Sequence, residues 1–191
     1  MRAHVMAVDR VERRLRRVTT ALDGAGIAYA VIGGNAVASW VGRVDPGATR
    51  ATRDVDLLVR REDDLSVAKV MSELGFERHD LRRMVLYVDP EEPAKRSGVH
   101  LVWDGELIKT TYLCQAPSVT EAVRDPEGFL VLSLEALVRM KLTSLRDIDR
   151  VHITDLIAVG LIDDQIRKSL PDELRERLDL IQGSFEDDLT E

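Results

Sequence analysis

The sequence has 191 residues, of which 45% are hydrophobic and 32% are charged, and its formal net charge is −7. This composition is ordinary for a globular chain with a buried core. The acidic balance argues against general coating of nucleic acid, and no apolar run approaches the roughly 20 residues that span a bilayer. A single cysteine, Cys114, excludes an internal disulfide framework and leaves no cysteine cluster for zinc, so we expect a cytoplasmic protein with no membrane partner.

The charge is unevenly distributed along the chain. Arginines crowd the N-terminal region, and the final residues, SFEDDLTE, are acidic. We interpret these segments as a solvated helix face and a frayed tail. A local basic face that meets RNA or another anionic partner is the alternative.

Hydrophobic periodicity and turn residues predict a regular order of elements in the first part of the chain. The expected elements are a helix over 8–23, a short buried strand over 27–33, a helix over 35–41, an irregular loop over 42–52, a strand over 53–60 and a helix over 61–76.

The second part is predicted to begin with strands and to end with helices. The dipeptide Asp104-Gly105 is typical of a two-residue hairpin, and Ser133 is a good helix N-cap. The expected elements are strands over 81–88, 98–103, 106–113 and 129–133, followed by helices over 134–145, 147–160, 163–170 and 172–181. We therefore predict an α/β (α+β) fold with a mixed sheet flanked by helices, in which 1–132 form the core and 133–191 a helical segment packed on it.

Two aspartates sit inside the predicted strand RDVDLLVR. Side chains two residues apart on a strand point to the same face, so Asp54 and Asp56 project together. Two neighbouring carboxylates repel unless something positive lies between them, and Mg²⁺ commonly binds one or two carboxylates together with substrate phosphates. Upstream, Gly33 and Gly34 join a strand to a helix, where backbone N–H groups can approach an anion. The two motifs together predict a site for a metal and a nucleotide.

The motifs "GGNAV" and "RATRDVDLLV" resemble those of the nucleotidyltransferase superfamily that includes DNA polymerase beta, and more closely those of its AbiEii/AbiGii-like branch of abortive-infection toxins. The resemblance extends to "LSLEALVRMKLTSLRDIDRVHITDL", which is similar to that branch's lysine helix and the acidic helix after it. It implies transfer of a nucleoside monophosphate from a nucleoside triphosphate to a hydroxyl, with Mg²⁺ or Mn²⁺. The implied acceptor is RNA, such as a tRNA end, with a protein side chain second. A toxin role and a cognate antitoxin would follow from the resemblance alone.

Carried over by position, the resemblance implies that Asp54 and Asp56 bind metal and act in catalysis. It implies that Lys141 contacts a phosphate and that Arg146, Asp149 and Asp155 shape the same cleft. The nucleotide-binding residues that it implies are Gly33, Gly34, Asn35, Arg50, Thr52, Lys141 and Arg146. Arg50 has two open roles, contact with a phosphate or attachment of its own loop.

The superfamily usually adds a third carboxylate from a later strand, and the equivalent slot here is His100. A neutral imidazole there can ligate a metal, act as a base, or simply be a hydrogen-bonded, half-buried residue, but it does not equal a carboxylate as a ligand for Mg²⁺. The missing oxygen could come instead from Asp89, Asp104 or Glu106.

Lys141 also has two interpretations. Its helix has an apolar stripe, so Lys141 either contacts phosphate or extends from the edge of that stripe to solvent. His152 and Asp155 share a helix face, which is compatible with an ordinary side-chain pair or with a site. Two alternative functions remain beside catalysis: a nucleotide- or RNA-binding member of the fold without turnover, and a toxin–antitoxin interaction partner that uses the C-terminal helices.

Overall fold

The computed structural model describes residues 2–90 and 98–190, and side chains over 10–90 and 98–187. A seven-stranded mixed sheet has the order β3-β4-β5-β2-β1-β7-β6. Its strands are β1 (Tyr29–Ile32), β2 (Val55–Val59), β3 (Glu77–Asp80), β4 (Val85–Val88), β5 (Val99–Trp103), β6 (Ala122–Arg124) and β7 (Leu130–Leu132).

The helices flank this sheet, and short 3₁₀ turns occur at Pro46–Ala48, Arg61–Asp63 and Val119–Glu121. The helices are α1 (Arg2–Gly24), α2 (Gly33–Gly42), α3 (Asp64–Glu73), α4 (Leu134–Ser144), α5 (Asp147–Ala158), α6 (Asp164–Ser169) and α7 (Asp172–Thr190). The fold is the predicted mixed α/β arrangement. None of the described helices is long and apolar enough to cross a membrane.

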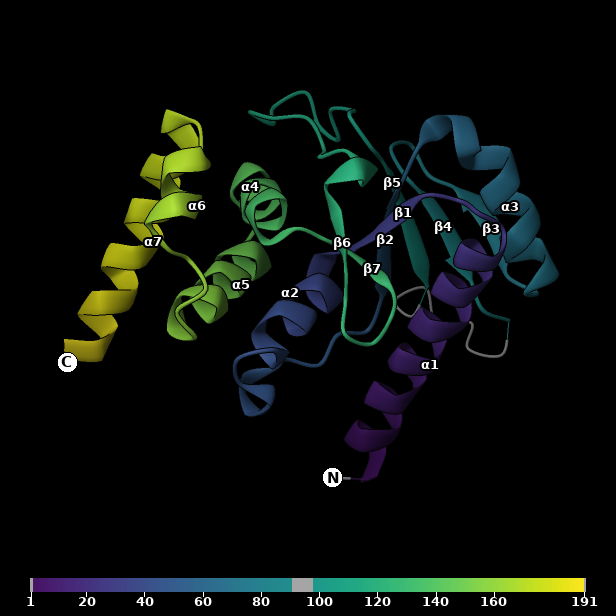
Figure 1. The fold of residues 1–191 in the computed structure, drawn as a ribbon, viewed down its shortest axis with the longest axis horizontal. Helices are drawn as coiled ribbons and strands as arrows, with labels where there is room; N and C mark the ends of the chain where they lie inside the picture. The colour runs from purple at the N-terminus through teal and green to yellow at the C-terminus, as the bar shows by residue number, and fades with distance from the viewer. Residues whose placement is uncertain (1, 91–97, 191) are drawn as a thin grey trace.

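Figure 1 shows α1 and α3 beside one half of the sheet and α4 to α7 beyond its other half, with α2 leading from β1 toward them. The predicted apolar spacing of the first helix is confirmed, because Val11, Leu15, Val18 and Leu22 are all buried. β1 and β2 are antiparallel, whereas β2 and β5 are parallel. In this register Ile32 lies opposite Asp56, and Asp56 lies beside His100. The side chains of Ile32, Asp56 and His100, on the adjacent strands β1, β2 and β5, therefore point to the same face of the sheet.

The predicted strand over 106–113 and its hairpin at Asp104-Gly105 are wrong. The chain instead forms a loop over 104–116, closed by Gly105 N–H donating to the Ala116 carbonyl (3.1 Å) and Ala116 N–H donating to the Glu106 carbonyl (2.8 Å). β5 already has β4 on one edge and β2 on the other, so no edge remains for a hairpin partner. Strands β3 and β6 were not predicted, and most of the turn-prone segment at 89–98 lies outside the described residues.

The C-terminal helices are part of the hydrophobic core. The apolar side of α6 and α7 is buried, as Ile166, Leu170, Leu174, Leu178 and Ile181 show. Arg177 of α7 donates hydrogen bonds to the carbonyls of Leu142 (2.7 Å) and Thr143 (3.1 Å) at the end of α4. These carbonyls belong to the last turn of a helix, where intrahelical partners are missing. The last helix therefore helps to hold α4 in place.

Candidate active site

The turn between β1 and α2 needs both of its glycines. Gly33 has a φ of +68°, and a Cβ on it would lie 2.0 Å from Oδ2 of Asp56. A Cβ on Gly34 would lie 2.6 Å from Cγ2 of Thr52. The absence of side chains lets a carboxylate and a threonine lie directly against the first turn of α2, whose N-terminus favours negative charge.

Asp54, Asp56 and His100 form the polar end of this site. Both aspartates were predicted to lie on one strand and to share a face of it. Asp56 lies in β2, whereas Asp54 directly precedes the strand. Nδ1 of His100 lies 3.1 Å from Oδ1 of Asp56. Because Asp56 is a carboxylate acceptor, Nδ1 carries the proton in this contact. This hydrogen bond is the main reason why the pKa of His100 is raised.

Asp54 has the features of a carboxylate that lacks its counter-ion. Its Oδ1 is buried and accepts no hydrogen bond from the described residues. Burial raises the pKa of Asp54, and the nearby charge of Asp56 acts in the same direction, which together outweigh the opposing charges of His100, Arg14 and Arg53. A divalent cation would satisfy this oxygen and offset the repulsion, so the pair suits one metal ion that takes further ligands from phosphate and water.

No described residue adds a third carboxylate to this pair. Over 10–90 and 98–187, no group of three or more His, Cys, Asp or Glu side chains is arranged to hold a metal. Oδ2 of Asp104 accepts from Val119 N–H (3.2 Å), Glu106 is paired with Arg61, and Asp89 lies 3.5 Å from Arg17. Asp104 also follows the far end of β5, four residues from His100, which is about 13 Å along a strand. His100 therefore occupies the slot beside Asp56.

Asn35 and Thr52 bind protein groups. The amide nitrogen of Asn35 donates to the Asp54 carbonyl (2.7 Å), and the Thr52 hydroxyl donates to Oδ1 of Asn35 (2.9 Å). Arg50 donates to Asp155 through Nε (2.6 Å) and Nη2 (2.9 Å). This contact attaches the loop to α5, which is one of the two predicted roles of Arg50, and contact with a phosphate stays a prediction. Together these residues fix the backbone that leads into Asp54.

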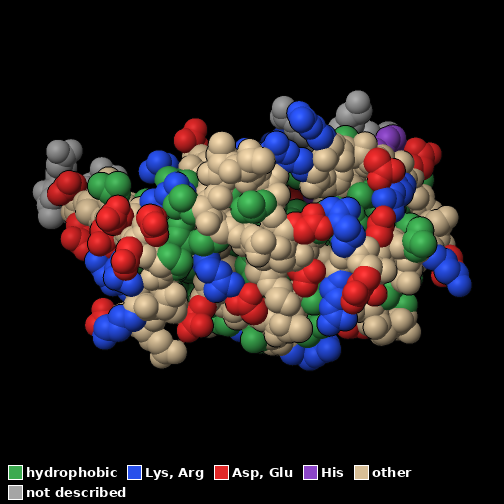
Figure 2. All heavy atoms as spheres, turned by 90° about the horizontal axis from the view of Figure 1, so that it is seen from above, with side chains coloured by type: hydrophobic (Ala, Val, Ile, Leu, Met, Phe, Trp, Pro, Cys, Tyr) green, Lys and Arg blue, Asp and Glu red, His purple; other side chains and the backbone are tan. Residues whose placement is uncertain are grey.

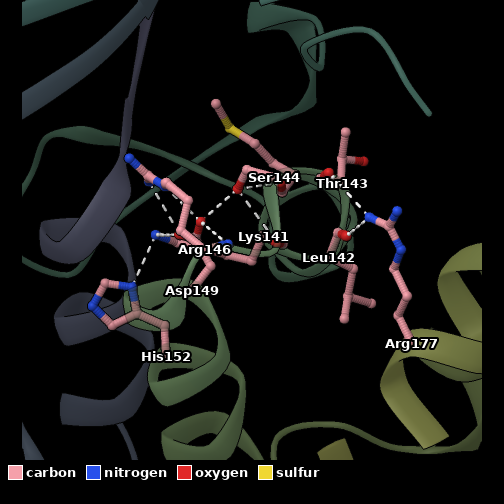
Figure 3. A network of polar contacts seen from close by, with 9 residues as sticks. Lys141, Leu142, Thr143, Ser144, Arg146, Asp149, His152 and Arg177 are labelled. Atoms are coloured by element: carbon pink, nitrogen blue, oxygen red, sulfur yellow. Dashed lines mark hydrogen bonds and ion pairs between the residues drawn. The ribbon is translucent and has the colours of Figure 1, made fainter. Parts of the chain in front are cut away.

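Lys141 belongs to a buried polar network with Asp149 and His152 (Figure 3). Its Nζ lies 3.0 Å from Oδ1 of Asp149 and 2.9 Å from Nδ1 of His152. Asp149 also accepts from Ser144 Oγ (2.6 Å) and from Arg146 Nε (2.7 Å). Lys141 is only 4% exposed, so the interpretation in which it extends to solvent is wrong.

The network fixes the charges of its members. Burial alone would raise the pKa of Asp149, but hydrogen bonds from Arg146 and Ser144 and the charge of Lys141 hold that pKa well below its usual range. Burial lowers the pKa of Lys141, against the opposing charge of Asp149. Burial and the charge of Lys141 lower the pKa of His152 to about 4. His152 is therefore neutral at pH 7, and its Nδ1 accepts a hydrogen bond from the ammonium group of Lys141.

His152 predicts a specific loss of stability in acid. The unfolded chain protonates this residue near pH 6.5, whereas the folded chain does so only near pH 4, so unfolding becomes more favourable as the pH falls between these values. The cost by pH 4 is up to about 3 kcal/mol at roughly 1.4 kcal/mol per pH unit. We expect urea titrations of His152→Gln to show a flatter stability profile from pH 6.5 to 4, while parallel profiles for the two proteins would contradict the assignment.

A cavity of about 120 Å³ brings some of the predicted residues together. Gly33 and Asp56 line one side, and Lys141, Arg146 and Asp149 line another. Asn35, Arg50 and Thr52 instead line a separate cavity of about 600 Å³, bounded by α1, α2 and the segment before β2. The predicted nucleotide-binding residues are thus divided between the two sides of the first turn of α2.

Sequence reasoning missed the remaining wall of the smaller cavity. It consists of Met84, Val102, Ile108, Tyr112, Cys114, Gln115, Ala116 and Met140, besides residues of the α4–α5 turn. Much of this wall comes from the 104–116 loop, which had been predicted as a strand. The scattered apolar residues of that segment were the only sequence signal for this wall.

Comparisons with known proteins bear on the fold of this chain. The model of the aminoglycoside-2''-adenylyltransferase family matches residues 14–97. Among curated proteins, none matches the sequence significantly. The fold is similar to that of the antibiotic-resistance factor ANT(2'')-Ia in complex with adenylyl-2''-tobramycin, with a TM-score of 0.53 and 18% identity over 93% of this chain and 97% of that one. A solution structure of ANT(2'')-Ia gives a TM-score of 0.52 and 15% identity over 98% and 95% of the two chains.

The lincomycin-bound lincosamide antibiotic adenylyltransferase LnuA is also similar, with a TM-score of 0.56 and 14% identity over 78% of this chain and 98% of that one. The chain therefore has the nucleotidyltransferase fold, as the glycine pair and the aspartates predicted. The match of residues 14–97 to an adenylyltransferase family model supports the predicted enzyme class, nucleotidyltransferase. The AbiEii-like branch stays a prediction.

Proposed function

We propose that this chain transfers a nucleoside monophosphate from a nucleoside triphosphate to an acceptor hydroxyl, with Mg²⁺ or Mn²⁺. One observation carries the proposal: Asp56 lies in the space that a side chain on Gly33 would fill, and it is close enough to Asp54 for the two charges to repel. One carboxylate is thus held against a helix N-terminus, and a second, whose Oδ1 accepts no hydrogen bond from the described residues, lies near it. Phosphoryl transfer requires mainly positioning and neutralisation of charge, and this arrangement supplies both.

The chain would bind the phosphates at the start of α2. Backbone N–H groups of a first helical turn are free to donate, and the two glycines let an anion come close to them. Arg146 lines the same cavity, and its side chain is 60% exposed although it is paired with Asp149. Its guanidinium has donors left over for a phosphate oxygen. Lys141 adds a positive charge to the cavity wall.

Asp54 and Asp56 would hold the metal, which neutralises phosphate charge and orients the reacting oxygens when bound. His100 acts through Asp56 as a positioning residue, because its Nδ1–H group fixes one carboxylate oxygen. The other oxygen of Asp56 faces Gly33 and the helix N-terminus. A cytoplasmic location would supply both the nucleotide and the metal.

The acceptor has two candidates. RNA, including a tRNA end, is the acceptor that the AbiEii-like sequence motifs imply, together with a toxin role and an antitoxin partner. A small hydroxylated compound is supported by the similarity to adenylyltransferases whose ligands are tobramycin and lincomycin. The alternative of a binding protein without turnover is favoured by one observation, which is that His100 takes the slot of the third carboxylate.

The test is to incubate the protein with each α-labelled triphosphate and Mg²⁺ or Mn²⁺, in separate reactions with total RNA, tobramycin and lincomycin. We expect label to appear in one acceptor. A double variant, Asp54→Asn with Asp56→Asn, should give none, whereas Asp164→Asn, at an exposed carboxylate of α6, should label normally. Tight binding of triphosphate without any product would support the binding protein, and equal labelling by both variants would remove the proposal.

A further inference from the structure

The cavity beside Asp56 has two chemically different halves. Asp56, Lys141 and Arg146 make one half polar, while the other half carries side chains of Met84, Val102, Ile108, Tyr112 and Met140. An apolar wall this close to a charged centre does not serve phosphate binding. Its free volume of about 120 Å³ approaches the roughly 150 Å³ of an apolar cavity that accepts benzene. The space is suited to one ring rather than to a whole nucleotide.

The 104–116 loop that supplies this wall is attached at several points. Two backbone hydrogen bonds close its base, and Arg83 donates to the Ile108 carbonyl (3.3 Å). Arg61 pairs with Glu106 and stacks on Trp103 at 4.6 Å from the ring centre. These contacts present Ile108, Tyr112 and Cys114 to the cavity, where each stays only half-buried. Half-buried apolar side chains on an anchored loop are positioned to contact a ligand.

The charges of the cavity exclude a polycation. Its lining has two carboxylates, of which Asp149 is bound by Lys141, Arg146 and Ser144. The other, Asp56, is bonded to His100 and is assigned to the metal. No lining carboxylate remains to pair with the ammonium groups of an aminoglycoside. Of the two lining cations, Lys141 is held by Asp149 and His152, whereas Arg146 keeps donors for a phosphate oxygen at the polar half. The apolar half contributes no charged side chain to the lining.

Resting on the proposed function, we propose that the apolar half of this cavity binds an uncharged ring, with Tyr112 as the residue that stacks on it. The ring belongs either to the base of the nucleoside triphosphate or to the acceptor. Stacking of a base on an aromatic side chain is worth roughly 1–3 kcal/mol by alanine substitution, which corresponds to about five- to 150-fold in affinity. The loop therefore determines which substrates enter, and it selects against acceptors that are polycations.

The experiment compares dissociation constants of ATP, inorganic tripolyphosphate, lincomycin and tobramycin, each with Mg²⁺, for wild type and Tyr112→Ala. Tyr112→Phe keeps the ring, and Leu107→Ala alters an exposed residue of the same loop, so both serve as controls. If Tyr112→Ala lowers the affinity for ATP about tenfold and leaves the affinity for tripolyphosphate unchanged, the ring that Tyr112 binds is the base. The same loss for lincomycin alone identifies the acceptor.

Unchanged affinities for ATP and lincomycin, or a loss that is equal for tripolyphosphate, would overturn the assignment of Tyr112. A loss confined to tobramycin would overturn the exclusion of polycations. A different result would contradict the proposed function. In that case tripolyphosphate would not bind, or its affinity would not change in Asp56→Asn, both with tyrosine and with alanine at position 112. Circular dichroism melts of Tyr112→Ala establish that the variant is folded.

Discussion

Replacement of Asp56 by Asn is expected to reduce nucleotide transfer by at least 10²- to 10³-fold, the usual range for loss of one preorganised electrostatic contact in an active site. The amide keeps the size of the side chain, so it still fits against Gly33. It removes the negative charge that a metal needs and that repels Asp54. Stability should therefore stay within about 1 kcal/mol of wild type or increase.

Two measurements separate this effect from misfolding. Transfer rates are compared with thermal melts, and Mn²⁺ binding is followed by electron paramagnetic resonance, with Asp164→Asn as the matched control. A variant that melts normally but neither binds Mn²⁺ nor transfers label agrees with the assignment. Full Mn²⁺ affinity in Asp56→Asn would show that this carboxylate is not a metal ligand.

Asp149→Ala is expected to cost about 3–5 kcal/mol of folding free energy, the usual penalty for breaking a buried ion pair. Asp149 is fully buried, and Lys141 is 4% exposed, so the ammonium group would remain inside without a carboxylate. The Ser144 hydroxyl and the Arg146 backbone N–H would lose the same acceptor. The α4–α5 turn would therefore lose its central contact.

Denaturant titration at pH 7 measures this loss, and Asp147→Ala, an exposed carboxylate two residues earlier, is the matched control. Addition of Lys141→Met should recover part of the stability, because it removes the unpaired charge. A cost below about 1 kcal/mol for Asp149→Ala would mean that the buried pair contributes little.

The fold could be predicted where periodicity was strong. The helix that became α1 has buried residues at regular spacing, and β1 and β2 are short continuous apolar runs. The prediction of a strand within 104–116 was wrong because β2 and β4 already occupy both edges of β5. The structure of this segment therefore depends on residues far from it in the sequence. Local sequence contains no information about which edges are free. The short strands β3 and β6 were missed because their exposed residues give little pattern.

The fold brings together only part of the predicted site. Gly33, Asp56, Lys141 and Arg146 line one cavity. Asn35, Thr52 and Arg50 form hydrogen bonds to protein groups and line another cavity. Hydrogen bonds between residues far apart in the chain follow from packing, so the local sequence does not reveal them. The burial of Lys141 was equally hidden, since its acceptor Asp149 belongs to the next helix. Tyr112 could not be recognised before its loop was placed.

The two hydrogen bonds from Arg177 to the end of α4 have a consequence for biosynthesis. Lys141 lies on α4, and α4 is held by a helix that the ribosome makes after it. Gly33 and Asp56 are made much earlier, but they line a cavity whose opposite wall includes Lys141. We expect a ribosome-bound chain without α7 to bind nucleotide poorly, so that nucleotide binding begins only after α7 has been made.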